Sequence, residues 1–416
     1  MQLDRNILFN NRSKIQFDWM LLLNTIVILL IGLISLYSAT YDSNMSSFFY
    51  KQIVSIGIGF VLMFMIIYLP DSWIKFNSWI FYILSLLLLI VVAFVGVEIN
   101  GTKGWLRLGG FSLQPAEFAK IGVLLAIASV VSRKGVNIHT WRDFAVVLLI
   151  VAVPSFLIMK QPDFGTATVI FAMLYGILLW IGFSPFILYT LISIPFLILF
   201  SFKGDIWFYS LAAVLSLFLF TFRRNLILTI GLILIFFSIN FISDNVYEKL
   251  SPHQKLRIQT FVEPEANPLG AGYNVIQSVM AVGSGGLTGK GFLQGTQTQL
   301  RYIPMQWTDF IYSVPTEEFG FIGGVAVILL LFSMIWRMIN IASIVHDKFH
   351  SVVCIGAVSI LFYHSFINIG MAIGVMPVMG IPLPFMSYGG TFVISNLILV
   401  GLVMNVHRTH YLKRSI

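Results

Sequence analysis

The sequence predicts an all-α membrane protein, a polytopic bundle of about twelve transmembrane helices. Hydrophobic residues make up 58% of its 416 residues and charged residues only 10%, whereas soluble domains carry about 25% charged residues. The mean hydropathy is +0.91, and apolar runs long enough to span a bilayer recur along the chain. These observations favour one bundle of helices as the folding unit.

Twelve apolar segments are predicted spans, several of them close to the minimum of roughly 17 residues for crossing a bilayer. They cover residues 19–39, 51–69, 75–97, 117–132, 143–160, 165–183, 186–202, 206–221, 224–243, 320–341, 351–375 and 390–407. The first run is too long for the apolar part of a signal peptide, so we expect it to remain as a span. The close-set segments between 186 and 243 leave open a re-entrant piece.

Lysine and arginine are distributed unevenly between the two sides of the predicted bundle. With the N-terminus in the cytoplasm, the inner segments hold Arg5, Arg12, Lys14, Lys75, Arg133, Lys134, Arg142, Arg223, Arg224, Arg337, Lys348, Arg408, Lys413 and Arg414. The short outer segments hold only Lys51, Lys103, Arg107, Lys160 and Lys203. This positive-inside pattern predicts a cytoplasmic N-terminal segment (1–18), one transmembrane domain (19–407) and a cytoplasmic tail (408–416). The net charge of +8 therefore does not indicate a nucleic-acid partner.

In this topology the polar stretch 244–319 is a long outer loop between the ninth and tenth spans. Three shorter polar loops share that face: 98–116, 160–164 and 376–389. Acidic residues also gather at the outer ends of spans: Asp42, Glu98, Glu117, Asp163, Asp205, Asp309, Glu317 and Glu318. Because an ionisable group near membrane depth is costly and usually functional, we expect chemistry on the outer face.

Three of these acids stand in similar polar settings. Glu117 precedes Lys120 by three residues, which places both on one helical face, and Asp163 follows Lys160 at the same spacing. Asp309 has no lysine or arginine within seven positions of the sequence. One interpretation is that the acids form helix-end ion pairs that help the bundle to pack. The other is that they line a cavity in which Asp309 acts as a general base.

Other polar residues are candidates for phosphate or metal binding. Lysines and arginines on the outer face suit phosphate oxygens: Lys103, Arg107, Lys120, Lys160 and Arg257. The single cysteine, Cys354, lies in an apolar run and is expected to be a small buried residue. The histidines at 346, 350, 407 and 410 are scattered on the predicted cytoplasmic side and show no metal-ligand pattern.

Two segments of the predicted outer face are rich in glycine. GSGGLTGKG (283–291) looks like a phosphate loop, but Ser284 stands at the first glycine of the Walker A motif and Gly291 follows the lysine. A flexible turn is the alternative. VMPVMGIPLPFMSYGGT (375–391) is irregular backbone that we expect to fold back into the bundle and line a cavity, and Ser387 within it is a predicted cavity residue.

Several ordered motifs together resemble the SEDS family, the shape, elongation, division and sporulation proteins of bacteria. They are QPAEFAK, KQPDFGT, NPLGAGYNVIQS, GSGGLTGKG, GTQTQL, TDFIYSVPTEEFG and NIGMAIGVMPVMGIPLPFMSYGG. The GTQTQL segment resembles the RodA branch more than the FtsW division branch. The resemblance covers nearly the whole chain, and so many motifs in order make it specific.

The resemblance implies a peptidoglycan glycosyltransferase that polymerises lipid II on the outer face of the bacterial cytoplasmic membrane during cell elongation. It further implies that Asp309 is the catalytic acid and that Glu117, Lys120 and Asp163 line the same cavity. Basic residues would stabilise the departing lipid diphosphate, and a divalent cation such as Mg²⁺ or Mn²⁺ could share that task; the sequence does not decide this. The implied partners are a class B penicillin-binding protein and other elongation-complex proteins.

The chain also departs from the family pattern. Glu263 replaces the aspartate of a DP pair before the PLGAGY segment, and Asn267 replaces the next acid. Gly104 replaces an arginine, and Met305 and Trp307 replace a glutamate and a histidine. The family usually has ten spans, so the region between 184 and 243 holds two more than expected. A lipid II flippase, marked by inverted repeats and mid-membrane charges, and a non-catalytic scaffold are the alternative functions.

Overall fold

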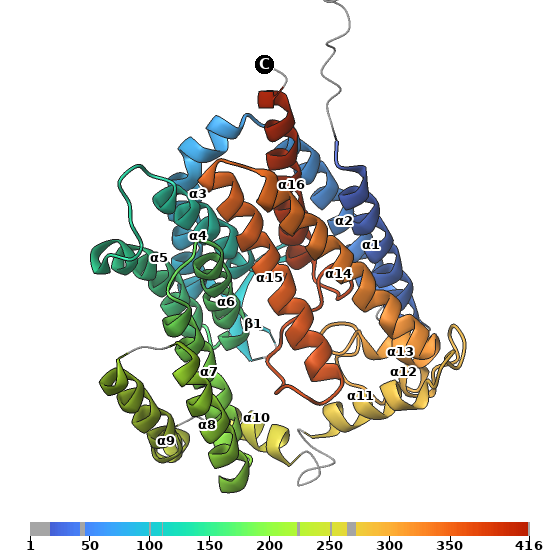
Figure 1. Cartoon of the computed structure of the whole chain (residues 1–416). Helices are drawn as coiled ribbons and strands as arrows, with labels where there is room; N and C mark the ends of the chain where they lie inside the picture. The colour runs from blue at the N-terminus through green and yellow to red at the C-terminus, as the bar shows by residue number, and fades with distance from the viewer. Residues whose placement is uncertain are drawn as a thin grey trace, which may run out of the picture.

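The computed structural model is a bundle of helices with a small sheet (Figure 1). It describes residues 17–41, 46–99, 101–109, 111–222, 225–249, 252–263 and 272–414. The main helices are α1 (Trp19–Thr40), α2 (Ser46–Tyr68), α3 (Asp71–Val95), α4 (Pro115–Val131), α5 (Trp141–Met159), α6 (Phe164–Trp180), α7 (Pro185–Ser201), α8 (Asp205–Leu219), α9 (Leu226–Lys249), α14 (Gly320–Ile344), α15 (Lys348–Ala372) and α16 (Gly390–Arg414). The shorter elements are β1 (Val97–Ile99), β2 (Thr102–Leu108), β3 (Phe111–Leu113), η1 (Phe220–Phe222), α10 (Pro252–Val262), α11 (Tyr273–Ser284), α12 (Thr296–Gln299) and α13 (Ser313–Glu318).

Each of the twelve predicted spans falls on one of the main helices. Within the described residues, nine helices are long and apolar enough to cross a membrane by length and composition: α1, α2, α3, α5, α8 together with η1, α9, α14, α15 and α16. Helices α6 and α7 are shorter apolar helices, and α4 has 17 residues. The prediction of an all-α polytopic membrane protein is confirmed, with nine long apolar helices and shorter ones beside them.

Local sequence explains where several helices begin. Asp18 caps α1 and accepts a hydrogen bond from the Leu21 N–H at 2.9 Å. Asp163 caps α6, and Asp347 caps α15. Helix α4 starts with Pro115 at its first position, where the missing N–H costs nothing and the fixed φ suits the helix. A side-chain oxygen at the cap satisfies one of the N–H groups that the first turn leaves unpaired.

Helices α15 and α16 form the centre of the bundle. The most apolar window of α15 is 78% buried and that of α16 83%, whereas the windows of α8 and α9 are 22% buried. Helix α16 packs on α2, and α15 packs on α6 and α14. Helix α1 also approaches the chain just before α16 closely, since a Cβ at Gly32 would lie 2.6 Å from the Phe385 carbonyl oxygen.

The segment 98–116 was predicted as a polar outer loop, and most of it forms an antiparallel sheet in the order β1-β2-β3. Val97 pairs with Trp105, and Leu106 pairs with Leu113. Thr391, at the start of α16, fastens this sheet to the bundle: its hydroxyl donates to the Ser112 carbonyl oxygen at 3.1 Å.

The polar stretch 244–319, predicted as a loop, contains several short helices. Helix α9 continues to Lys249, and α10, α11, α12 and α13 follow it. These short helices gather at one end of the bundle, while α1 begins and α16 ends at the opposite end (Figure 1). The described ends of the chain therefore lie on the same side, as an even number of spans requires.

The region between 184 and 243 holds three helices, α7, α8 and α9, at the edge of the bundle (Figure 1). They share a small apolar core of their own. Its fully buried residues are Leu197, Phe208, Ala212, Leu219, Phe236 and Ile239.

Candidate functional site

Asp309 lies shortly before α13 and is half-buried. Its backbone carbonyl oxygen accepts a hydrogen bond from Asn368 Nδ2 of α15 at 2.9 Å. Its carboxylate faces the loop before α16, because a Cβ at Gly380 would lie 3.9 Å from Asp309 Oδ2. The position of the carboxylate is therefore defined by α15 and by this loop, residues 376–389.

Residues 381–387 of the loop 376–389 are mostly buried, as its composition predicted, and the loop is hydrogen-bonded to the segment that carries Asp309. Ser387 is fully buried. Its Oγ donates to the Thr308 carbonyl oxygen at 2.6 Å and accepts from the Leu383 N–H at 2.8 Å. The Tyr388 N–H donates to the Trp307 carbonyl oxygen at 2.8 Å. Ser387 thus holds the backbone beside Asp309.

Helix α4 carries the predicted ion pair. Lys120 Nζ lies 2.8 Å from Glu117 Oε2, and the two residues are 1% and 3% exposed. The carboxylate also accepts a hydrogen bond from Ser395 Oγ at 2.9 Å. On its other side Lys120 Nζ lies 3.0 Å from His364 Nε2 and 5.5 Å from the centre of the Phe392 ring. Protein groups therefore enclose the ammonium group.

Asp163 lies at the start of α6. Its carboxylate accepts from the Thr166 N–H at 3.0 Å, the Thr166 hydroxyl at 2.8 Å and Gln114 Nε2 at 2.9 Å. Burial raises the pKa of Asp163, against the lowering effect of the Thr166 hydrogen bonds. A Cβ at Gly165 would lie 2.5 Å from the Met379 carbonyl oxygen. Gly165, two residues after Asp163, and Asp309 therefore lie beside neighbouring residues of the loop, Met379 and Gly380.

Three of the other predicted phosphate ligands have exposed side chains. Lys160 is exposed, with its Nζ 5.4 Å from the centre of the Phe156 ring. Lys103 and Arg107 are exposed on β2. Arg257 belongs to α10, but its side chain lies outside the described residues.

Sequence reasoning missed the residues that join these parts, chiefly His364 and Asn368 of α15. Asn368 Nδ2 also donates to the Ile381 carbonyl oxygen at 2.8 Å. A signal for them was present, since both are polar residues one helical turn apart inside an otherwise apolar span, where polar groups are expensive.

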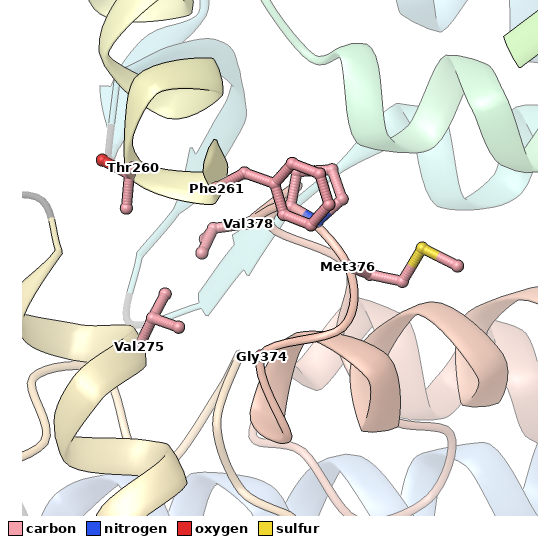
Figure 2. A pocket seen from close by; sticks show the side chains of 7 residues that line it. Thr260, Phe261, Val275, Gly374, Met376 and Val378 are labelled. Atoms are coloured by element: carbon pink, nitrogen blue, oxygen red, sulfur yellow. The ribbon is translucent and has the colours of Figure 1, made fainter. Parts of the chain in front are cut away.

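No metal centre accompanies the cluster in the described part of the chain. No three side chains of His, Cys, Asp or Glu gather there in a way that could hold a metal ion. Figure 2 shows a small pocket between α10, α11 and the loop, lined by Thr260, Phe261, Val275, Gly374, Met376, Pro377 and Val378. Apart from Thr260 its lining residues are apolar or glycine, and they include none of the predicted site residues.

Comparisons with known proteins identify the family of this chain. The family model of the FtsW, RodA and SpoVE cell cycle proteins matches residues 16–203 and 182–412. The chain is 31% identical to the peptidoglycan glycosyltransferase RodA of Treponema pallidum, over 95% of this chain and 98% of that protein. It is 34% identical to the stage V sporulation protein E of Bacillus subtilis, over 95% and 98%.

Solved structures extend the likeness to the fold. A chain from a peptidoglycan synthase complex that coordinates polymerization and crosslinking superposes with a TM-score of 0.72 at 30% identity, covering 95% of this chain and 99% of that one. Sequence and fold thus agree over nearly the whole chain. The protein belongs to the FtsW/RodA/SpoVE family, the SEDS family of membrane proteins.

Proposed function

We propose that this membrane protein, a peptidoglycan glycosyltransferase by its family, polymerises lipid II on the outer face of the bacterial cytoplasmic membrane during cell elongation. The elongation role follows the GTQTQL motif. The observation that carries the proposal is the placement of Asp309: a half-buried carboxylate beside Gly380, at the junction of α13, α15 and the loop 376–389.

In the proposed reaction the donor is a lipid-linked disaccharide-peptide diphosphate. The acceptor is the 4-hydroxyl group on the sugar of another lipid II. Asp309 accepts the hydroxyl proton as the oxygen attacks the anomeric carbon, and the bond from that carbon to the diphosphate breaks. A carboxylate held within hydrogen-bond reach of the proton can act in this way. We assign the attraction of the anionic diphosphate to Lys103, Arg107 and Lys160, whose side chains are exposed.

The proposed partner is a class B penicillin-binding protein, which would cross-link the new strands. The likeness to a chain of a peptidoglycan synthase complex supports such an assembly. Both termini are proposed to be cytoplasmic, which places the 244–319 stretch and the Asp309 cluster outside. The distribution of lysine and arginine supports this orientation.

The test is polymerisation by purified protein, with its partner, given lipid II. We expect glycan chains on a gel. A flippase would instead move lipid II across vesicle membranes without making polymer. Transport without chains would contradict the proposal and favour that alternative.

A further inference from the structure

A buried histidine of α15 stands between the ion pair of α4 and the loop beside Asp309. His364 is 2% exposed. Its Nε2 lies 3.0 Å from Lys120 Nζ, and its Nδ1 lies 3.1 Å from the Pro382 carbonyl oxygen. Because an ammonium group has only donors, Nε2 accepts from Lys120. The proton of the neutral ring is then on Nδ1, which donates to Pro382; this tautomer is assigned from the two partners.

Asn368 lies one helical turn after His364, on the same face of α15. Its Nδ2 donates to the carbonyl oxygens of Ile381 and Asp309, at 2.8 and 2.9 Å. Both protons of the amide are thereby used. One face of α15 therefore holds three carbonyl groups, those of Asp309, Ile381 and Pro382.

This face sets the distance between the loop and the Asp309 carboxylate. Asn368 bonds to Ile381, which directly follows Gly380 in the loop. A Cβ at Gly380 would lie 3.9 Å from Asp309 Oδ2. If the peptide group of Pro382 moved, this wall of the site would move with it. A misplacement of about 1 Å in a catalytic arrangement can cost about 100-fold in rate.

We propose that His364 is a positioning residue for Asp309, acting through its hydrogen bond to the Pro382 carbonyl oxygen. Lys120 then fixes the histidine ring instead of binding substrate phosphate, the role that its charge suggested. The ammonium group is 1% exposed and contacts both Glu117 and His364. This inference rests on the proposed glycosyltransferase function.

Three substitutions separate the two hydrogen bonds of the ring. His364→Asn puts an amide donor near the position of Nδ1, within reach of the Pro382 carbonyl. His364→Gln puts an amide near the position of Nε2, facing Lys120, and His364→Ala removes both bonds. We expect the Gln and Ala variants to lower kcat for lipid II polymerisation roughly 10- to 100-fold with KM unchanged. The Asn variant should recover most of kcat.

Ser365→Ala is the matched control. Ser365 lies next to His364 on α15, and its hydroxyl donates to the Leu361 carbonyl oxygen of the same helix at 2.8 Å. This substitution should leave kcat unchanged. Melting temperatures of all variants in detergent show whether each is folded. If the Ala variant does not fold, the comparison of the Asn and Gln variants, which both keep a buried amide, still tests the proposal.

Backbone hydrogen exchange of residues 376–389 gives a second measurement that does not depend on activity. We expect faster exchange in the Gln and Ala variants than in the Asn variant and Ser365→Ala. Equal kcat and equal exchange in the Asn and Gln variants would overturn the assignment. If the wild-type protein makes no polymer, the proposed function fails while the exchange experiment still decides what His364 holds in place.

Discussion

Lys290 Nζ lies 2.7 Å from Glu317 Oε1, so the lysine of the glycine-rich segment 283–291 is paired with a carboxylate of α13. The segment's backbone is held as well: the N–H groups of Lys290 and Gly291 donate to the carbonyl oxygens of Glu317 and Glu318, at 3.0 and 2.9 Å. A Cβ at Gly289, where φ is +82°, would lie 2.1 Å from the Glu318 carbonyl oxygen. Glycine serves close backbone packing here.

The two adjacent glutamates of α13 are buried in different ways. Burial alone would raise the pKa of Glu317, but hydrogen bonds from Lys290, Gln297 and Thr298 outweigh it and hold that pKa below its ordinary value. Burial raises the pKa of Glu318, against hydrogen bonds from groups that include Ser38. Within the described residues, Glu318 Oε2 is buried with no hydrogen-bond partner.

We therefore expect Glu317→Gln to destabilise the protein more than Glu318→Gln. Losing hydrogen bonds to a charged group costs about 1–3 kcal/mol each, and Lys290 would lose its counter-charge. The pKa of Glu317 is lower in the folded state, so this residue stabilises the fold at pH values above its unfolded pKa and stops doing so as pH falls through its folded pKa. The pKa of Glu318 is higher in the folded state, so its contribution to stability is present below its unfolded pKa and is lost as pH rises through its folded pKa.

Melting temperatures in detergent between pH 5 and pH 8 provide the measurement. Glu318→Gln should be the more stable of the two variants, and its advantage in melting temperature should grow as pH rises. A Glu318→Gln variant that is the less stable of the two at pH 8 would contradict this account.

The ion pair of α4 predicts a non-additive result. Glu117→Gln or Lys120→Met alone leaves one buried charge without its counter-charge, a change that costs about 3–5 kcal/mol in buried pairs. The double variant removes both charges and should be more stable than either single variant. Thermal unfolding of the four proteins measures the coupling. A double variant that is the least stable would show that the two residues act separately.

Membrane orientation can be tested with single cysteines. Leu300 follows α12 and is 60% exposed, whereas Lys134 is exposed after α4. In intact spheroplasts an impermeant thiol reagent should modify Leu300→Cys, and it should modify Lys134→Cys only after lysis. The native Cys354 is 0% exposed and should give little background. The reverse labelling pattern would place the Asp309 cluster in the cytoplasm.

Hydropathy predicted the main helices well because a chain in lipid must satisfy its backbone hydrogen bonds within each span. The small sheet escaped prediction because β1 and β3 have three residues each. These strands are joined by short turns, and the sheet is hydrogen-bonded to Thr391, which lies far along the chain. The end of α9 at Lys249 also lies beyond the apolar run that predicted it.

Sequence spacing predicts the contacts of the candidate site only where they are local. The pair Glu117–Lys120 follows from helical spacing, and the structure contains it. The role of Lys290 depends on Glu317, 27 residues away. The partners of His364 and Asn368 include backbone carbonyl groups of a later loop, and no pattern of side chains in the sequence indicates where a carbonyl group will lie.

Asp309→Asn tests the proposed chemistry most directly. The substitution keeps the shape of the side chain and the backbone bond to Asn368, but an amide cannot accept the hydroxyl proton. We expect polymerisation to fall roughly 10²- to 10⁴-fold, the usual loss for a general base, with the melting temperature near that of the wild type. Glycan chain length on a gel, beside thermal unfolding of the purified variant, measures both. A stable Asp309→Asn protein that makes chains at the wild-type rate would remove Asp309 from the mechanism and leave Asp163 and Glu117 as candidates.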